Sequence, residues 1–170
     1  MKTLPVFLLA SVAVLSFSAS APAEEKNGLS VSVSKTTLEK NDTRGAGYYS
    51  DRINRTQALK AVIKNVSFKE MPEGEVIWTV LVKRYSYADI ASFTGTEKLK
   101  ALKPAEASEM VFGSAQITGY SGYSETYKDK TEWQITVKQD GKELIKTQST
   151  STFDQMAKRA IKGEKPEKRD

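Results

Sequence analysis

Residues 131–150 read TEWQITVKQDGKELIKTQST, and this stretch decides the fold class. Residues 131–138 alternate polar and apolar side chains, so that Trp133, Ile135 and Val137 share one face, as in a half-buried β-strand. The Asp-Gly pair at residues 140–141 favours a tight primed turn, because glycine adopts a positive φ without a steric cost. Residues 143–150 then return as the partner strand. The stretch therefore predicts an antiparallel β-hairpin.

Similar alternation recurs between turn-forming segments along the chain. Further strands are predicted at residues 29–34, 57–66, 76–82 and 109–117. The stretch 76–82 is the most apolar of these and is predicted to be a central strand. Trp78 and Trp133 alternate in phase with apolar neighbours and are interpreted as core residues. Residues 41–51 are predicted to form a loop, and residues 85–95 an irregular segment or a short edge element. Short strands joined by turns predict an all-β antiparallel sandwich.

Helical periodicity is confined to the C-terminal part of the chain. One apolar helical face is formed by Phe153, Met156, Ala157 and Ala160. This spacing predicts a short helix over residues 153–161, and residues 163–170 are predicted to be a disordered charged tail. The predicted division is a signal peptide at residues 1–23, a β-sandwich at residues 28–152, and the helix and tail at residues 153–170.

Several segments resemble those of bacterial secreted immunoglobulin-like domains. Residues 58–67 and 76–82, joined by a Pro/Gly turn, are similar to strands B and C of that family, including a tryptophan on strand C. Residues 102–106 (LKPAE) resemble the Leu-x-Pro-Gly-Glu segment that leads into strand E, with Ala105 in place of the usual glycine. Residues 133–147 resemble the F–G hairpin. The resemblance implies an immunoglobulin-like sandwich of about seven strands. It implies no particular function.

The N-terminal residues have the three parts of a secretory signal peptide. Lys2 forms a small basic region, residues 4–17 form an apolar run, and residues 21–23 (APA) fit the small-x-small cleavage pattern. The apolar run is shorter than the roughly 20 residues that span a bilayer. We therefore expect an exported protein, periplasmic, at the cell surface or secreted, with no transmembrane segment after cleavage.

In overall appearance, size and export signal, the chain is similar to a narrower group of proteins. These are the small exported immunoglobulin-like proteins encoded with type IV pilus-like machinery in mucus-dwelling gut bacteria. The similarity implies a structural or interaction role at the cell surface or in association with a pilus. It carries over no site residues.

The amino-acid composition excludes several classes of catalytic and metal-binding site. The chain has no histidine and no cysteine, so a Ser-His-Asp triad, a Cys-His pair, a zinc site and a haem site are excluded. Carboxylate-pair or Ser-Lys chemistry would remain, but Glu70, Glu73 and Glu75 surround a Pro/Gly turn and are interpreted as a solvated loop. The net charge of +5 is too small and too scattered to predict nucleic-acid binding, although it suits mild attraction to an anionic envelope or to polyanionic glycans. We expect no catalytic residue, metal or cofactor.

Tyrosine, serine and glycine are concentrated at residues 119–128 (GYSGYSETYK). Tyrosine supplies a large amphipathic contact area and serine and glycine supply adaptable hydrogen bonding, as in binding paratopes. A second aromatic pair lies in the glycine-rich loop. The candidate binding residues are Tyr120, Tyr123, Tyr127, Tyr48 and Tyr49. The alternative interpretation is that one of the first three is a tyrosine-corner residue, which packs and bonds to nearby backbone.

The favoured function is therefore that of an exported, non-catalytic structural or interaction module. Its partner would be another envelope or extracellular protein, bound by protein–protein contact. The alternative is a carbohydrate-binding module that uses exposed tyrosines. A small enzyme of carboxylate chemistry is a third hypothesis.

Overall fold

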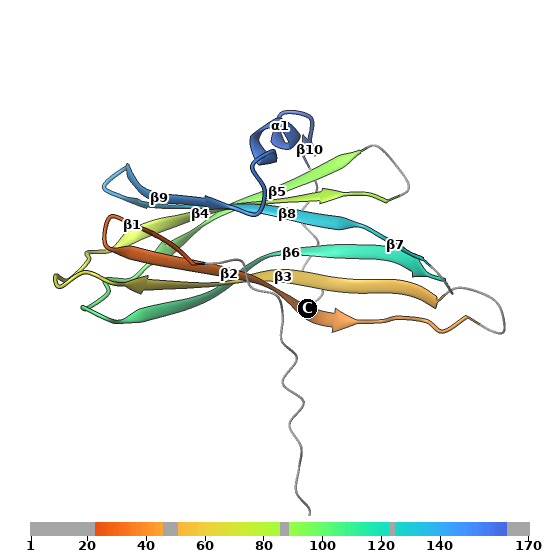
Figure 1. Ribbon diagram of the computed structural model, residues 1–170, viewed down its shortest axis with the longest axis horizontal. Coiled ribbons are helices and arrows are strands. Elements are labelled where there is room, and N and C mark those ends of the chain that lie inside the picture. The colour runs from red at the N-terminus through yellow and green to blue at the C-terminus, as the bar shows by residue number, and fades with distance from the viewer. Residues whose placement is uncertain (1–22, 46–50, 86–88, 123–124, 163–170) are drawn as a thin grey trace, which may run out of the picture.

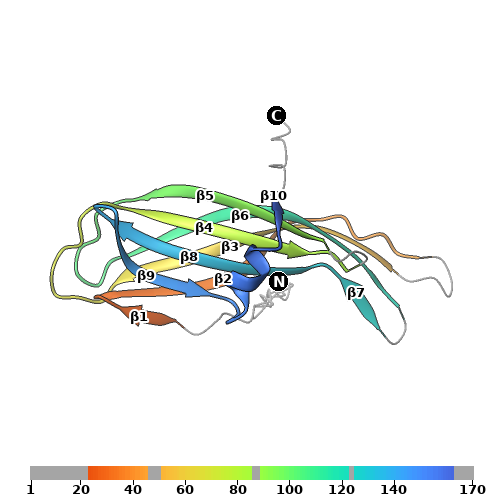
Figure 2. The same cartoon turned by 90° about the horizontal axis from the view of Figure 1, so that it is seen from above.

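The computed structural model describes residues 23–45, 51–85, 89–122 and 125–162. These residues form two β-sheets packed face to face (Figures 1 and 2). The first sheet, in the order β1-β2-β3-β6-β7, consists of β1 (Glu24–Lys26), β2 (Leu29–Lys40), β3 (Asp51–Asn65), β6 (Ala107–Ser121) and β7 (Thr126–Lys128). The second, in the order β10-β5-β4-β8-β9, consists of β10 (Ile161–Lys162), β5 (Ile90–Leu99), β4 (Gly74–Lys83), β8 (Lys130–Gln139) and β9 (Lys142–Gln148). The predicted all-β sandwich is confirmed. The signal peptide, apart from its last residue, and the charged tail lie outside the described residues.

The strand order matches the connectivity of an immunoglobulin-like sandwich. In that fold strands B and E are neighbours in one sheet, and strands C, F and G form the other. Here β3 lies beside β6, while β4, β8 and β9 follow one another in the second sheet. The segments compared above with strands B, C and E and with the F–G hairpin therefore occupy the matching positions.

The β8–β9 hairpin forms as the sequence predicts. Asp140 has φ 49° and Gly141 has φ 76°, and both positive values are what a primed turn of the I′ type requires. The flanking residues Gln139 and Lys142 are paired across the turn. The side chains of Trp133, Ile135 and Val137 are buried in the main core.

The prediction for residues 85–95 is wrong in extent. β5 runs from Ile90 to Leu99 and pairs with the whole length of β4. The sequence of β5 lacks the apolar alternation that predicts a strand, because several of its central positions are threonine, glycine or serine. Other predicted strands are too short as well, since β2 continues to Lys40, β3 begins at Asp51 and β6 runs from Ala107 to Ser121. The predicted loop at residues 41–51 is correspondingly shorter.

The C-terminal helix is also shorter than predicted. α1 spans Phe153–Ala157, and residues 161–162 form β10, which pairs with β5 in parallel. Phe153 is buried against Leu81 and Ile90 on the outer face of the second sheet, and Met156, Ala157 and Ala160 pack around this small cluster. Burial of this apolar face stabilises only one helical turn and a half, because the chain then pairs with the edge of β5.

The main core lies between the two sheets and is organised around Trp78. Its ring stacks on Phe112 of the facing sheet, with ring centroids 5.8 Å apart. On its own sheet the ring covers Gly95, where an added Cβ would lie 2.4 Å from the indole. Trp78 is 9% exposed and Trp133 is 3% exposed. Both tryptophans are therefore core residues, as the sequence predicts.

The turn before β6 shows how Ala105 replaces the glycine that is usual in the family. Ala105 has φ 65°, the left-handed conformation that glycine adopts freely and an L-residue adopts at a cost. Its N–H donates a hydrogen bond to the carbonyl of Asn65, which fixes this conformation. Ala105 therefore occupies a conformation that glycine would adopt at a lower cost.

Replacing Ala105 with glycine is expected to stabilise the protein. The relief of left-handed strain exceeds the added chain entropy of glycine, so the free energy of unfolding should rise by up to about 1 kcal/mol. Urea denaturation followed by circular dichroism measures the change. The matched control is Ala107→Gly in β6, which should destabilise by about 0.5–1 kcal/mol. A destabilising effect of Ala105→Gly would contradict the assignment of strain to this turn.

Candidate functional site

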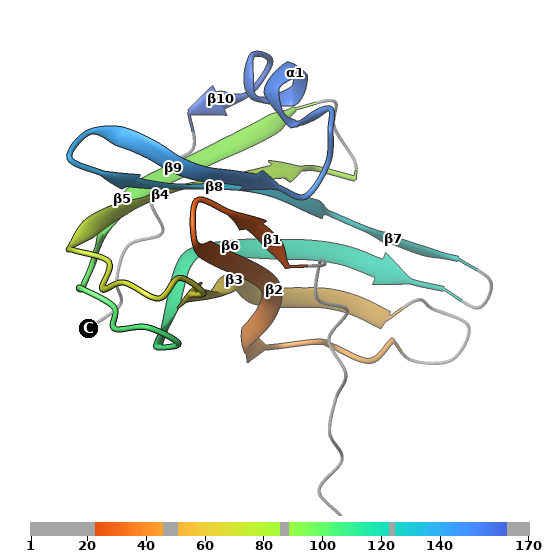
Figure 3. The same cartoon turned by 60° about the vertical axis from the view of Figure 1, so that its left-hand side comes forward.

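The two sheets are unequal at one end of the sandwich. β3, β6 and β7 run on past the end of β4 and the start of β5 (Figures 1 and 3). β7 pairs with β6 in the first sheet, and β8, which begins two residues later, pairs with β4 in the second. The chain thus passes from one sheet to the other at Asp129. Beyond this point, none of the strands that the structure describes lies opposite the inner face of the first sheet.

Asp129 fixes this crossing. Its side chain is 1% exposed and forms an ion pair of 2.7 Å with Arg84 at the end of β4. The same carboxylate accepts hydrogen bonds from the backbone N–H and the hydroxyl of Thr118 in β6, at 2.9 and 3.1 Å. It also accepts one from the backbone N–H of Tyr85, at 3.0 Å. One buried carboxylate therefore ties β4 of the second sheet to β6 of the first.

Three tyrosines gather beside this crossing. Tyr120 and Tyr127 are directly opposite each other on β6 and β7, so their side chains share one face of the sheet. The backbone N–H of Tyr85 is bound by Asp129, and the ring of Tyr85 packs edge-on against Tyr120 with centroids 5.9 Å apart. The exposed fractions of Tyr85, Tyr120 and Tyr127 are 39%, 42% and 57%. Arg52 lies opposite Tyr120 on β3, and these four residues are called the tyrosine surface.

The hydroxyl of Tyr85 is electrostatically coupled to its neighbours. Partial loss of solvent raises the pKa of Tyr85, and the nearby hydroxyl of Tyr120 and the charge of Asp129 act in the same direction. The phenol therefore stays neutral over the whole physiological pH range. It is available as a neutral hydrogen-bonding group.

The sequence predicted part of this surface. Tyr120 and Tyr127 do lie side by side on the outside of the sheet, and neither belongs to the core. Tyr123, Tyr48 and Tyr49 lie outside the described residues. The strands leading to both segments are neighbours, because Asp51 pairs with Ser121. Tyr85 was missed, because only the pairing of β4 with β8 and the bonds to Asp129 bring it to Tyr120.

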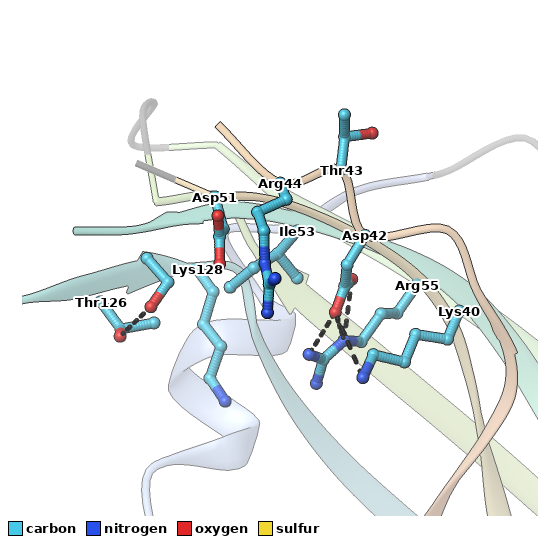
Figure 4. Close-up of a pocket in the computed structure, with 10 residues that line it drawn as sticks. Lys40, Asp42, Thr43, Arg44, Asp51, Ile53, Arg55, Thr126 and Lys128 are labelled. Carbon is cyan, nitrogen blue, oxygen red and sulfur yellow. Dashed lines mark hydrogen bonds and ion pairs between the residues drawn. The ribbon is translucent and has the colours of Figure 1, made fainter. Parts of the chain in front are cut away.

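A pocket of about 490 Å³ lies on the opposite face of the same strands (Figure 4). Thr126 and Lys128 line it, whereas Tyr127 between them points away, as strand alternation requires. The remaining lining residues are Lys40, Asp42, Thr43, Arg44, Asp51, Ile53, Arg55 and Ser121. We call this the basic pocket, because its lysine and arginine side chains outnumber its two aspartates.

Asp42 is already engaged within this pocket. Both of its carboxylate oxygens lie 3.0 Å from Nε of Arg55, and Lys40 lies 3.7 Å away. The hydrogen bond from Arg55 lowers the pKa of Asp42, and the adjacent backbone N–H of Asn54 and the two cationic side chains add to this effect. A glycosidase acid needs a raised pKa, so Asp42 is suited to orienting Arg55 rather than to donating a proton.

Other carboxylates offer no better arrangement for chemistry. Glu70, Glu73 and Glu75 are all exposed, but the predicted solvated loop does not include Glu75, which lies in β4. Across residues 23–45, 51–85, 89–122 and 125–162, no three acidic side chains are grouped so as to hold a metal ion. The same residues contain no helix that is both long and apolar enough to span a membrane.

Comparisons with known proteins give a distant likeness only. No family model matches the chain, and no curated protein matches it. Among solved structures, it is similar to a crystal structure from Akkermansia muciniphila, with 10% identity over 84% of each chain and a TM-score of 0.36.

The crossing at Asp129 yields a stability prediction. Asp129→Asn removes the charge that pairs with Arg84 and replaces one of its two acceptor oxygens with an amide NH2 that would face other donors, so the free energy of unfolding should fall by about 3 kcal/mol. Urea denaturation measures this loss, and near-ultraviolet circular dichroism should also show altered packing of Tyr85. Asp140→Asn is the matched control, because Asn-Gly suits the same hairpin turn and the stability should hardly change. Equal stabilities of the two variants would contradict the role of Asp129.

Proposed function

We propose that this protein is an exported, non-catalytic interaction module that binds a protein partner through the tyrosine surface. The single observation that carries the proposal is the partly exposed cluster of Tyr120 and Tyr127 on paired strands with Tyr85 packed against Tyr120. Tyrosine and arginine are enriched at protein interfaces, where an aromatic ring buries apolar area and its hydroxyl keeps a polar partner. Arg52 beside Tyr120 adds a cation of the kind that anchors such interfaces.

The rigidity of the cluster supports this role. Tyr120 and Tyr127 stand on paired strands, and the backbone of Tyr85 is held by the buried carboxylate of Asp129. Side chains held in this way lose little conformational freedom on binding, so more of the contact free energy contributes to affinity. The surface is therefore suited to recognition without prior rearrangement.

The proposed location is the cell envelope or the cell surface. It rests on the three-part signal sequence at residues 1–23 and on the resemblance to exported immunoglobulin-like proteins. On the narrower resemblance, the partner would belong to a pilus-like assembly. The non-catalytic character rests on the absence of histidine and cysteine from the sequence and on the lowered pKa of Asp42.

The alternative function is carbohydrate binding by the same tyrosines. The exposed faces of Tyr120 and Tyr127 on neighbouring strands favour it, because aromatic rings offer apolar surface with polar groups at their edges. It would involve neutral sugars, since the tyrosines supply no charge.

Photo-crosslinking in the native cell tests the protein-contact proposal. A benzophenone amino acid placed at Tyr127 should give a discrete protein adduct, and Arg52→Ser should reduce its yield. Phe68, which is 100% exposed at the other end of β3, is the matched control position and should give no such adduct. Equal adducts from both positions, or none from Tyr127, would count against the proposal.

A panel of neutral glycans tests the alternative with purified protein. Carbohydrate binding predicts a signal that Tyr120→Ala and Tyr127→Ala each reduce by about tenfold, equivalent to about 1.4 kcal/mol. If Tyr127 gives no protein adduct and no neutral glycan binds, both the protein-contact function and the carbohydrate-binding function are rejected.

A further inference from the structure

Beside the basic pocket lies a second hollow, between the inner face of the first sheet and the first residues of β8. This hollow has a volume of about 230 Å³, and Lys128 lines both cavities. Its other lining residues are Lys35, Gln57, Ile117, Asp129, Lys130, Thr131 and Glu132. The two cavities together are called the basic trough.

The trough contains positive charge that the described residues do not neutralise. Asp42 is shared between Arg55 and Lys40, and Asp129 is paired with Arg84. Within the described ranges, no ion pair involves Arg44 or Lys128. In Figure 4 the charged ends of Arg44, Lys128 and Arg55 extend into the same space. Arg44 and Lys128, which have no ion-pair partner among the described residues, and Arg55, which is oriented by Asp42, together form an arrangement that attracts and orients an anion.

Lys35 adds a second reason to expect an anion. Its ammonium donates to the backbone carbonyl of Thr131, so the side chain is drawn into the trough. Loss of solvent lowers the pKa of Lys35, Glu132 opposes this shift, and the positive charge of Lys128 adds to it. Lys35 and Lys128 therefore repel each other in the protein as it stands. An anion between them would relieve this repulsion.

The rest of the lining selects among anionic ligands. Hydroxyl groups come from Thr43, Ser121 and Thr126, and Ile53 is the one large apolar side chain that lines the basic pocket among the described residues. An acyl chain or an apolar peptide side chain would find little surface to cover it. A sugar presents hydroxyls that such groups can bind, and an acidic sugar adds the charge that the lysines and arginines require.

We propose that the basic trough is a binding site for an acidic glycan, whose carboxylate or sulfate groups contact Arg44, Lys128 and Arg55. Arg55 is presented in a fixed orientation by Asp42, and a guanidinium so held can bind a planar oxyanion with two hydrogen bonds. The trough and the tyrosine surface lie on opposite faces of β6 and β7. The proposal is therefore independent of the protein-contact function, and the chain would bridge a protein and an acidic polysaccharide.

Isothermal titration calorimetry at low ionic strength tests this site with four probes. They are an oligogalacturonate, a sulfated oligosaccharide of similar length, the neutral methyl ester of the oligogalacturonate, and an oligoglutamate of equal charge. We expect binding of the uronate, of the sulfated sugar, or of both, which identifies the acidic group. We expect binding about tenfold weaker or absent for the neutral ester and the peptide. Added salt should weaken the binding.

Paired double variants locate the binding in the trough. Arg44→Gln with Lys128→Gln should weaken the acidic-glycan affinity by about tenfold or more. Lys64→Gln with Lys100→Gln removes the same charge from two other exposed positions and should leave the affinity almost unchanged. Thermal unfolding verifies that both double variants are folded.

Four outcomes would overturn the proposal. They are no binding of either acidic sugar, equal affinity for the neutral ester, equal affinity for the oligoglutamate, and equal effects of the two double variants. Tyr127→Ala should leave this binding unchanged. Failure of the trough proposal therefore remains distinguishable from failure of the protein-contact proposal.

Discussion

A buried carboxylate, that of Asp129, joins the two sheets where their strands diverge. It accepts hydrogen bonds from β6 and from the residues that follow β4, and it lies where the chain leaves one sheet for the other. A buried charge is tolerated only when it is paired and fully hydrogen-bonded, so the crossing is restricted to one geometry. The positions of Tyr85 on one face and of Lys128 on the other both follow from that geometry.

Local features of the sequence predict the fold well where the structure depends on neighbouring residues. The β8–β9 hairpin combines strict alternation with an Asp-Gly turn, and both signals lie within the hairpin itself. The segment of β5 could not be predicted in the same way, because Gly95 is in a strand only through its partner. The indole of Trp78 fills the space that a side chain at Gly95 would occupy. Trp78 belongs to β4, so this contact is not visible in the sequence of β5. The predicted C-terminal helix was longer than α1. The apolar face continues in the sequence beyond Ala157, but the backbone at residues 161–162 pairs with β5 instead.

The candidate site was only partly predictable, for a related reason. Tyr120 and Tyr127 are close in sequence, and one hairpin-like pairing brings them together. Tyr85 reaches them through a contact between distant segments. The basic pocket depends on strand length, because β3, β6 and β7 continue where the second sheet has ended, whereas the second hollow is closed on one side by the first residues of β8. Alternation assigns Arg55 to an inner face, but the sequence does not show that this part of the face is uncovered.

The strap formed by α1 and β10 has a mechanical consequence. Its helix covers Leu81 and Ile90, and its two-residue strand occupies only Ala91 and Ser92 at the edge of β5. A free sheet edge can recruit a strand from another chain, and here a short parallel segment partly closes it. A pulling force applied at the C-terminus would load this strap before any other part of the sandwich. Its release would expose both an apolar patch and a strand edge.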